Sequence, residues 1–319
     1  MEEAALKFGI VGAGFIVKEF LENTKLLPFI SVEGIYSRTY ANAVEIAKKN
    51  DIPNVYSNFE DLLKSDVDAI YVATQNNTHF MYSQRALLAG KHVLCEKPAC
   101  VNFSQLFELL NLAEEKKLKF MEAMRFLYIP AYLELKKILA SKIFGEIISI
   151  EGSLGKISTR TYRHTKDLQG GATLDLGIYP ITAIIDILGF PDNITSACIK
   201  NEDGVDSSVS AIFTYKSGTI ANIHASFTSL TRGELRICTN KGVITIPKYW
   251  TTADKIILDN PQGKKDSLNF TLQGTGMAAE IEHFRLATRE MLRGDLSIQV
   301  VRAMDKIREQ IDVIFDSDK

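Results

Sequence analysis

The N-terminal stretch combines a short apolar strand, a glycine-rich turn and a helix, and this order restricts the fold more than any other feature. Leu6 to Val11 is an apolar run that ends in Gly-Ala-Gly, and a helical apolar pattern follows from Phe15 to Asn23. This is the setting of a dinucleotide-binding loop, in which glycines allow a tight turn and the first helical amides donate to a pyrophosphate. The candidate residues are Gly12, Gly14, Phe15 and Ile16. Val17 occupies the third glycine position of the usual fingerprint, a departure that predicts looser packing of helix against strand.

The alternation of strand and helix continues to residue 122. Strands are predicted at Ile30–Tyr36, Ala69–Val72, His92–Cys95 and Lys119–Glu122, and helices at Asn42–Asn50, Phe59–Lys64, His79–Ala89 and Ser104–Lys116. Such alternation indicates a doubly wound parallel sheet. We therefore predict an α/β fold with a Rossmann domain over residues 1–122.

Residues 123–319 have a different pattern. An amphipathic helix at Pro130–Ser141 is followed mainly by strand-like runs, at Glu146–Leu154, Ile194–Lys200, Ser207–Tyr215, Thr219–Phe227, Glu234–Thr239 and Gly242–Ile246. A helix from Ala172 to Leu188, with a bend or restart at Pro180, and two tail helices, Gly276–Leu292 and Ile298–Phe315, complete the pattern. Hairpin-like spacing predicts a large, mostly antiparallel open sheet with helices on one face. This half, residues 123–319, is predicted to be a separate α+β domain.

The strand ends of the first half carry the other cofactor candidates. Ser37 and Arg38 follow the second strand, where an acidic residue is expected for NAD and an arginine for the 2′-phosphate of NADP. NADP is therefore favoured, with NAD as the alternative if Arg38 only stacks on the adenine or faces solvent. Later strand ends contribute Thr74, Asn76, His79, Glu96 and Lys97. A capping role for Thr78 at the following helix start is an equal alternative there.

Three titratable residues form the catalytic hypothesis. Lys97 lies at a strand end, where open parallel sheets bind ligands, and Asp175 and Tyr179 are spaced by one helical turn. Oxidation of a carbinol requires a base for the hydroxyl proton. Either Lys97 or Tyr179 can take this proton, and we favour Tyr179 working with Lys97, with Asp175 orienting them or the substrate hydroxyl. The hypothesis requires the lysine and the tyrosine to converge over a bound pyridine ring.

These residues carry a resemblance to a known family. The segments Gly12 to Ile16, Ala73 to His79, and Cys95-Glu96-Lys97-Pro98 resemble the glucose-fructose oxidoreductase and inositol dehydrogenase family (Gfo/Idh/MocA). The segments Val93 to Pro98, Met121 to Met124 and Gly170 to Tyr179 are similar to its dihydrodiol and D-xylose dehydrogenase branch. The resemblance implies NADP-dependent oxidation of a sugar, polyol or cyclic diol, a cis Lys97-Pro98 bond, and pairing of the open sheet with a second subunit.

Substrate contacts are assigned to residues in segments expected to border the same cleft. They are Arg125, Tyr128, Arg163, His164 and Asp167, and each is equally compatible with an ordinary solvated loop. The dihydrodiol branch has a tryptophan beside the position of Arg163, whereas the single tryptophan here is Trp250. A polyhydroxylated sugar therefore fits at least as well as an aromatic diol.

Composition limits the classes of partner, metal site and cellular location that the chain can have. The chain has 319 residues, 24% of them charged, and a net charge of −2, and its basic residues are interleaved with acidic ones, so nucleic acid is not an expected partner. The four cysteines show neither metal-site nor disulfide spacing, which predicts no metal and a cytoplasmic location. No export signal or membrane segment is expected. The alternative function is a non-catalytic NAD(P)-binding regulator on the same fold.

Overall fold

A computed structural model describes residues 5–158 and 164–318 of the chain. Two compact units are formed, one from Met1–Arg125 with Gln273–Gly294 and the other from Phe126–Leu272 with Asp295–Lys319. The sequence suggested a single division at residue 122. The units differ from it because the segment Gln273–Gly294 returns to the first unit.

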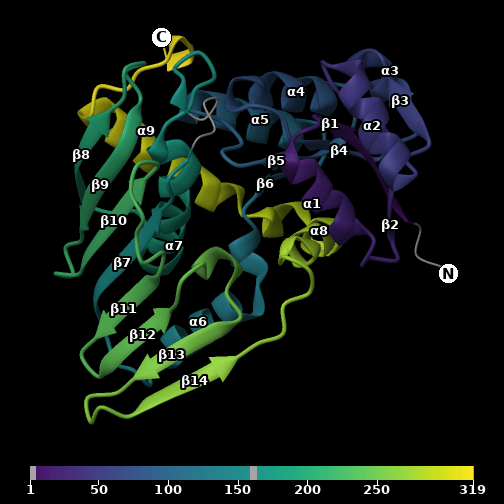
Figure 1. The fold of residues 1–319 in the computed structure, drawn as a ribbon. Coiled ribbons are helices and arrows are strands. Elements are labelled where there is room, and N and C mark those ends of the chain that lie inside the picture. Colours follow the sequence, from purple (N-terminus) through teal and green to yellow (C-terminus); the bar gives the residue numbers. More distant parts are fainter. Residues whose placement is uncertain (1–4, 159–163, 319) are drawn as a thin grey trace. The chain divides into compact units, whose positions relative to one another are not determined.

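The first unit is a parallel sheet with helices between its strands (Figure 1). Its strands follow the order β3-β2-β1-β4-β5-β6, and every neighbouring pair is parallel. The strands are β1 (Leu6–Val11), β2 (Ile30–Tyr36), β3 (Asn54–Tyr56), β4 (Ala69–Val72), β5 (His92–Glu96) and β6 (Phe120–Ala123). The helices are α1 (Phe15–Thr24), α2 (Tyr40–Asn50), α3 (Phe59–Lys64), α4 (Asn76–Leu88), α5 (Phe103–Glu115) and α8 (Met277–Leu286), followed by a 3-10 turn at Arg289–Leu292.

Local sequence accounts for most of these elements. Strand β4 is buried at all four positions, as expected for a central strand covered by helices on both faces. The side chains of Asn58 and Asn102 accept hydrogen bonds from Asp61 N and Gln105 N and so cap α3 and α5. Strand order changes direction between β1 and β4, so the carboxyl ends of these two strands flank the position where such sheets bind ligands.

The return of α8 to the first unit rests on aromatic packing. The ring of Phe284 lies 5.8 Å from that of Phe8 on β1, and Phe8 also meets Phe20 on α1 at 5.4 Å. All three side chains are fully buried. The Lys119 ammonium donates to the carbonyl of Phe284 at 3.0 Å, which ties the end of α8 to the start of β6. A segment distant in sequence therefore completes the core of this unit.

The second unit is built on an eight-stranded sheet of order β14-β13-β12-β11-β7-β10-β9-β8. The neighbours are antiparallel except β7 and β10, which are parallel. The strands are β7 (Ile147–Gly155), β8 (Asn193–Lys200), β9 (Asp206–Thr214), β10 (Ile220–Ser226), β11 (Leu235–Thr239), β12 (Gly242–Ile246), β13 (Lys255–Asp259) and β14 (Lys265–Asn269). The helices are α6 (Pro130–Ser141), α7 (Ile178–Leu188) and α9 (Gly294–Gln310), with a π-helical turn at Thr173–Gly177 and short 3-10 turns at Arg125–Tyr128, Trp250–Thr252 and Asp316–Asp318. The predicted α/β fold, with a Rossmann sheet and a mostly antiparallel open sheet, is confirmed.

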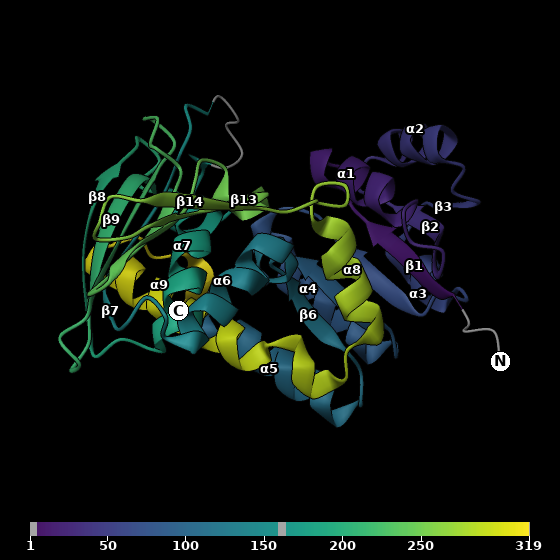
Figure 2. The ribbon, with the colours of Figure 1, turned by 90° about the horizontal axis from the view of Figure 1, so that it is seen from below.

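The two faces of this second sheet differ. Helices α6, α7 and α9 lie on one face (Figure 2), where Ala221, Ile223 and Ala225 of β10 are buried. The opposite face carries Ile212 and Ile220, which are 49% and 48% exposed, among polar side chains. Buried and more exposed side chains therefore alternate along β10 from Ile220 to Ala225, and the open face is partly apolar.

Several predicted elements begin or end elsewhere. Helix α4 starts at Asn76 rather than His79, so Thr78 lies in its first turn and donates to the Gln75 carbonyl instead of capping. The irregularity predicted at Pro180 lies earlier, in the π-helical turn at Thr173–Gly177, and α7 continues directly from this turn. Strands β3, β13 and β14 were not predicted.

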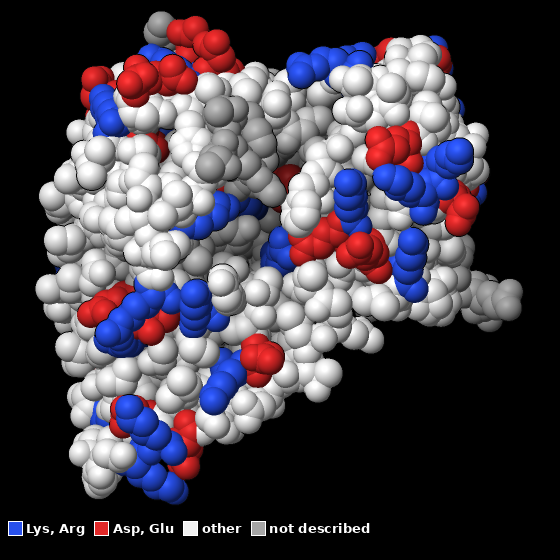
Figure 3. Space-filling model, viewed as in Figure 1, with Lys and Arg blue, Asp and Glu red and all other residues white. Residues whose placement is uncertain are grey.

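Charged side chains on the surface are mostly mixed in sign. In the face shown in Figure 3, basic and acidic residues lie in small adjoining groups. Ion pairs of opposite charge include Lys264 with Asp266 at 3.5 Å and Lys265 with Asp259 at 3.3 Å. Pairs this exposed contribute little to stability.

Candidate functional site

The glycine-rich turn lies between β1 and α1, at the carboxyl end of β1. Gly12 has φ +118°, and a Cβ there would lie 2.2 Å from the Ala73 carbonyl oxygen. Only glycine fits at such a contact, because the loop after β4 passes directly against the turn. Gly12 N also donates to the Tyr36 carbonyl at 2.9 Å, so this residue joins the ends of three strands.

Gly14 and the start of α1 form a cradle for an anion. No described atom lies within 4 Å of a Cβ placed on Gly14, so open space faces the helix start. Gly14 occupies the N-cap position without a side-chain cap, and the first turn of the ten-residue helix contains no acidic residue. The first amides of α1 are therefore next to open space, at the kind of helix N-terminus that binds phosphate groups in proteins. Val17, at the third glycine position of the fingerprint, is fully buried. Its side chain therefore packs in the core and does not occupy the open space beside Gly14.

The end of β2 presents Arg38 to solvent. Ser37 is half-buried and Arg38 is exposed. Beside them, the ring of Tyr36 lies 6.2 Å from that of Tyr82 and 5.9 Å from that of Phe59. Burial and a hydrogen bond with Tyr36 raise the pKa of Tyr82 to about 12, so this phenol stays neutral. An exposed guanidinium beside a rigid aromatic group suits recognition of a phosphate.

The loop after β4 is held by His79. This side chain is 1% exposed, and its Nδ1 lies 2.8 Å from the Pro98 carbonyl oxygen. Burial lowers the pKa of His79, so the ring is neutral. Thr74 accepts a hydrogen bond from Thr78 at 2.8 Å and is half-buried, as is Asn76 at the start of α4. His79 thus contacts the backbone that follows Lys97.

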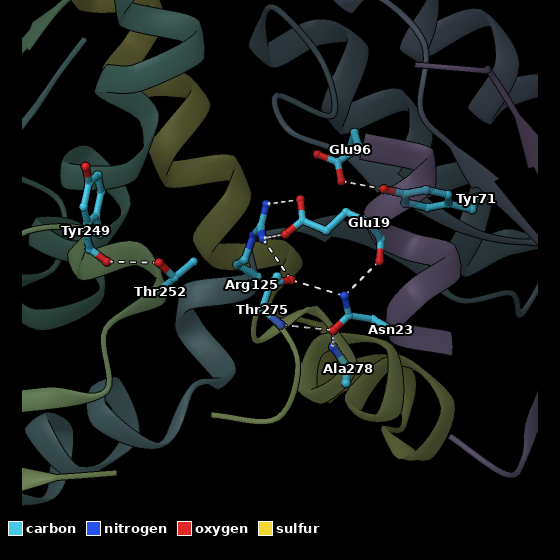
Figure 4. Close-up of polar contacts among 9 residues, drawn as sticks. All are labelled: Glu19, Asn23, Tyr71, Glu96, Arg125, Tyr249, Thr252, Thr275 and Ala278. Atoms are coloured by element: carbon cyan, nitrogen blue, oxygen red, sulfur yellow. Dashed lines mark hydrogen bonds and ion pairs between the residues drawn. The ribbon is translucent and has the colours of Figure 1, made fainter. Parts of the chain in front are cut away.

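The strand β5 delivers Glu96 and Lys97 to the same edge of the sheet. The Lys97-Pro98 bond is cis, as the family resemblance implied. Glu96 Oε1 accepts a hydrogen bond from the Tyr71 hydroxyl at 2.7 Å (Figure 4), and the Tyr71 ring stacks on Phe20 of α1. Burial raises the pKa of Glu96, against the lowering effect of this hydrogen bond. Lys97 itself is half-buried. Lys97 therefore lies between Glu96, which accepts a hydrogen bond from Tyr71, and Pro98, whose carbonyl contacts His79.

Arg125 forms a second buried contact with the cofactor-loop helix. Its guanidinium pairs with Glu19 of α1, and both side chains are more than four-fifths buried (Figure 4). Asn23, one turn further along α1, accepts hydrogen bonds from Thr275 N at 3.3 Å and Ala278 N at 3.2 Å. Sequence reasoning placed Arg125 against substrate. In the structure it ties the end of β6 to α1.

The second unit carries Asp175 and Tyr179. Asp175 lies in the π-helical turn, is 9% exposed, and has Oδ2 3.9 Å from Lys156 Nζ. Tyr179 is the second residue of α7, is half-buried, and has its ring 6.3 Å from that of Phe126. A π-helical turn is rare and is frequently found at functional sites. Lys97 belongs to the first unit and these two residues to the second.

The other substrate candidates are dispersed. Tyr128 is half-buried in a 3-10 turn and Asp167 is exposed in a loop. His164 is half-buried with its ring 4.4 Å from that of Phe227. Arg163 lies outside the described residues.

Sequence reasoning missed Asp206. This carboxylate is 1% exposed at the start of β9 and accepts hydrogen bonds from Thr173, the first residue of the π-helical turn. It is 33 residues from its partner in sequence, so no local pattern could have identified it.

Within 5–158 and 164–318, no group of three or more His, Cys, Asp or Glu side chains is placed to hold a metal ion. Among the helices of the same residues, none has the length and apolar character needed to cross a membrane.

A parallel sheet with a glycine turn at its switch point defines a protein of the dinucleotide-binding class. Two family models match the chain, the Gfo/Idh/MocA oxidoreductase family with an NAD-binding Rossmann fold over residues 6–124 and the Gfo/Idh/MocA C-terminal domain over residues 132–245. The chain belongs to the Gfo/Idh/MocA family of oxidoreductases.

Relatives and solved structures agree with this assignment. Trans-1,2-dihydrobenzene-1,2-diol dehydrogenase of Bos taurus is 31% identical, with 99% of each chain covered, and that of Xenopus laevis is 30% identical, with 98% of this chain and 99% of the relative covered. A 3-ketoreductase from Actinomadura kijaniata, solved with NADP and TDP-benzene, superposes with a TM-score of 0.86 at 24% identity over 96% of this chain and 98% of that one. UDP-N-acetylglucosamine 3-dehydrogenase from Acidithiobacillus ferrooxidans has a TM-score of 0.83 at 20% identity over 97% and 99% of the two chains. At these identities the two solved structures support the fold alone.

Proposed function

We propose that the protein is an NADP-dependent oxidoreductase that transfers a hydride between the nicotinamide and a carbinol carbon of a sugar, polyol or cyclic diol. The observation that carries the proposal is the open cradle at Gly14, at the same sheet edge as Lys97. The relatives named as trans-1,2-dihydrobenzene-1,2-diol dehydrogenases support a hydroxyl-bearing substrate. A bound nicotinamide dinucleotide supplies the hydride chemistry, and the protein supplies position and proton transfer.

The preference for NADP rests on the end of β2. An acidic residue there would bind the ribose hydroxyls of NAD and repel a 2′-phosphate. Ser37 and the exposed Arg38 provide a hydroxyl and a guanidinium instead. NAD is the second candidate cofactor.

The proposed catalytic residues are Lys97, Tyr179 and Asp175. An alcohol in water is too weak an acid to release its proton at neutral pH, so the site needs a base and a positive field near the oxygen. In the proposal, Tyr179 exchanges the hydroxyl proton, and the Lys97 ammonium favours the phenolate that does so. Asp175 orients these groups or the substrate hydroxyl. The proposed substrate contacts are Tyr128, Asp167 and Arg125, which also pairs with Glu19. Arg163 is a further candidate from sequence alone.

Measurement of nicotinamide absorbance tests this function. Purified protein is offered a panel of sugars, polyols and cyclic diols with NADP and separately with NAD, and we expect turnover with NADP. Lys97→Met should abolish turnover while leaving the Kd for NADP within about threefold. Lys49→Met, a change at a lysine whose side chain is 62% exposed, is the matched control and should leave both unchanged. NADP binding without turnover on any substrate would support the regulator, and turnover by Lys97→Met would refute the lysine's role.

We also propose that the protein is a cytoplasmic homo-oligomer that pairs through the open face of its eight-stranded sheet. The partly apolar character of that face at Ile199, Ile212 and Ile220 supports the proposal. Ile212→Glu should shift the mass measured by light scattering toward the monomer. An unchanged mass, or a monomeric wild type, would refute this interface.

A further inference from the structure

Asp206 lies buried beneath the π-helical turn of the second unit. Its Oδ2 accepts hydrogen bonds from Thr173 N at 2.6 Å and from the Thr173 hydroxyl at 2.7 Å. Thr173 is fully buried, and it lies two positions before Asp175. A carboxylate at the start of a helical segment stabilises the exposed amide groups there.

The other carboxylate oxygen is packed against backbone. Asp206 Oδ1 is buried and has no hydrogen-bond partner among the described residues. A Cβ on Gly171, where φ is +130°, would lie 2.3 Å from this oxygen, so a glycine is required there. The Gly171 carbonyl in turn accepts a hydrogen bond from Asp175 N at 3.1 Å. Asp206 is therefore connected to Asp175 through both Thr173 and Gly171.

The charge of Asp206 is retained at a cost. Burial raises its pKa to about 6, against the lowering effects of the Thr173 hydrogen bonds and of Arg308 on α9. Arg308 is itself paired with Asp305 and Asp318. On β8, the Cys198 thiol is a titratable neighbour, and Lys200, which pairs with Asp312, is the register partner of Asp206. A neutral asparagine would offer an acceptor oxygen to Thr173 without the burial of a charge. Because a neutral side chain would accept the same hydrogen bonds at a lower free-energy cost, the presence of a carboxylate at position 206 indicates a functional reason for the charge.

We propose that Asp206 is a positioning residue that, in its ionised form, holds the π-helical turn in the arrangement in which Asp175 and Tyr179 act. The inference rests on the proposed function, because it assigns Asp206 an effect on those two residues. Protonation of Asp206 weakens both hydrogen bonds to Thr173, since bonds to a carboxylate are stronger than bonds to a neutral acid. The turn then loosens, and turnover falls as the pH drops below about 6.

The first experiment compares Asp206→Asn with wild type from pH 5 to pH 8. We expect kcat about tenfold lower at pH 8, no inflection near pH 6, and an unchanged Kd for NADP. Because the folded carboxyl has a pKa above its ordinary 3.8, wild type loses stability as the pH rises through about 6, and the asparagine variant does not. The difference between the Tm of the variant and the Tm of wild type should therefore increase by a few °C from pH 5 to pH 8. A constant effect of the amide on Tm does not change this increase.

A second variant and a control make the test specific. Thr173→Val removes one hydrogen bond that lowers the pKa, so the low-pH limb of kcat should move to higher pH. Asp192→Asn, at an exposed carboxylate that accepts a hydrogen bond from Lys216 N, should leave kcat and its pH profile unchanged. A purely structural Asp206 would alter Tm but leave the kcat profile of Asp206→Asn like that of wild type, which overturns the inference. Absence of turnover by wild type would instead overturn the proposed function together with it.

Discussion

The two glycines of the cofactor turn should respond to the same substitution in opposite ways. Gly12→Ala places a Cβ 2.2 Å from the Ala73 carbonyl at a φ of +118°. A side chain at positive φ costs about 1–2 kcal/mol and relief of the overlap about 1–3 kcal/mol, so we expect about 2–5 kcal/mol of lost stability. Gly14→Ala meets no described atom within 4 Å and has φ −79°, so it should cost less than about 1 kcal/mol.

Gly14→Ala, the variant expected to keep its stability, should be the one that loses affinity for the cofactor. The space beside Gly14 is where the pyrophosphate is proposed to lie, so a methyl group there would push it from the first amides of α1. Loss of that contact should raise the Kd for NADP by about 10- to 100-fold, or about 1.4–2.8 kcal/mol. Urea unfolding gives the stabilities and titration calorimetry the affinities. Wild-type affinity in Gly14→Ala, or wild-type stability in Gly12→Ala, would refute this interpretation of the turn.

Two other substitutions test the electrostatics of the first unit. Arg38→Asp should weaken the binding of NADP by about 10-fold or more and favour NAD, because a carboxylate repels the 2′-phosphate. The ratio of the kcat/KM values for the two cofactors measures this preference. An unchanged ratio would exclude Arg38 from recognition of the 2′-phosphate. Burial, followed by the charge of Glu96, raises the pKa of the folded Glu280 carboxyl well above 4.5. Wild type therefore loses stability as the pH rises above 4.5, because the carboxyl ionises more readily in the unfolded chain than in the folded one. Glu280→Gln has no such carboxyl, so its stability relative to wild type should increase with pH. Thermal unfolding between pH 5 and pH 9 measures the difference, and a difference independent of pH would contradict the buried-acid explanation.

The sequence by itself determined the local elements and the residues that depend on them. The glycine turn, the polar residues at the ends of parallel strands and Lys97 were all predicted, because each rests on turn chemistry or periodicity within a few positions. The same local patterns predicted both sheets, but missed the short strand β3 and the hairpin of β13 and β14. Helix starts were less secure, since the N-cap residue of α4 is Gln75, whose side chain makes no capping hydrogen bond.

Only the tertiary structure decided which distant residues meet. The pairing of Arg125 with Glu19 spans 106 positions, and the bonds of Asp206 to Thr173 span 33. The return of α8 to the first unit depends on Phe284 reaching Phe8 across most of the chain. Burial then set the pKa of Asp206 and Glu280, which no sequence pattern contains. The physical reason is that periodicity and turn preference act between near neighbours, whereas partner choice and desolvation are set once the whole chain has packed.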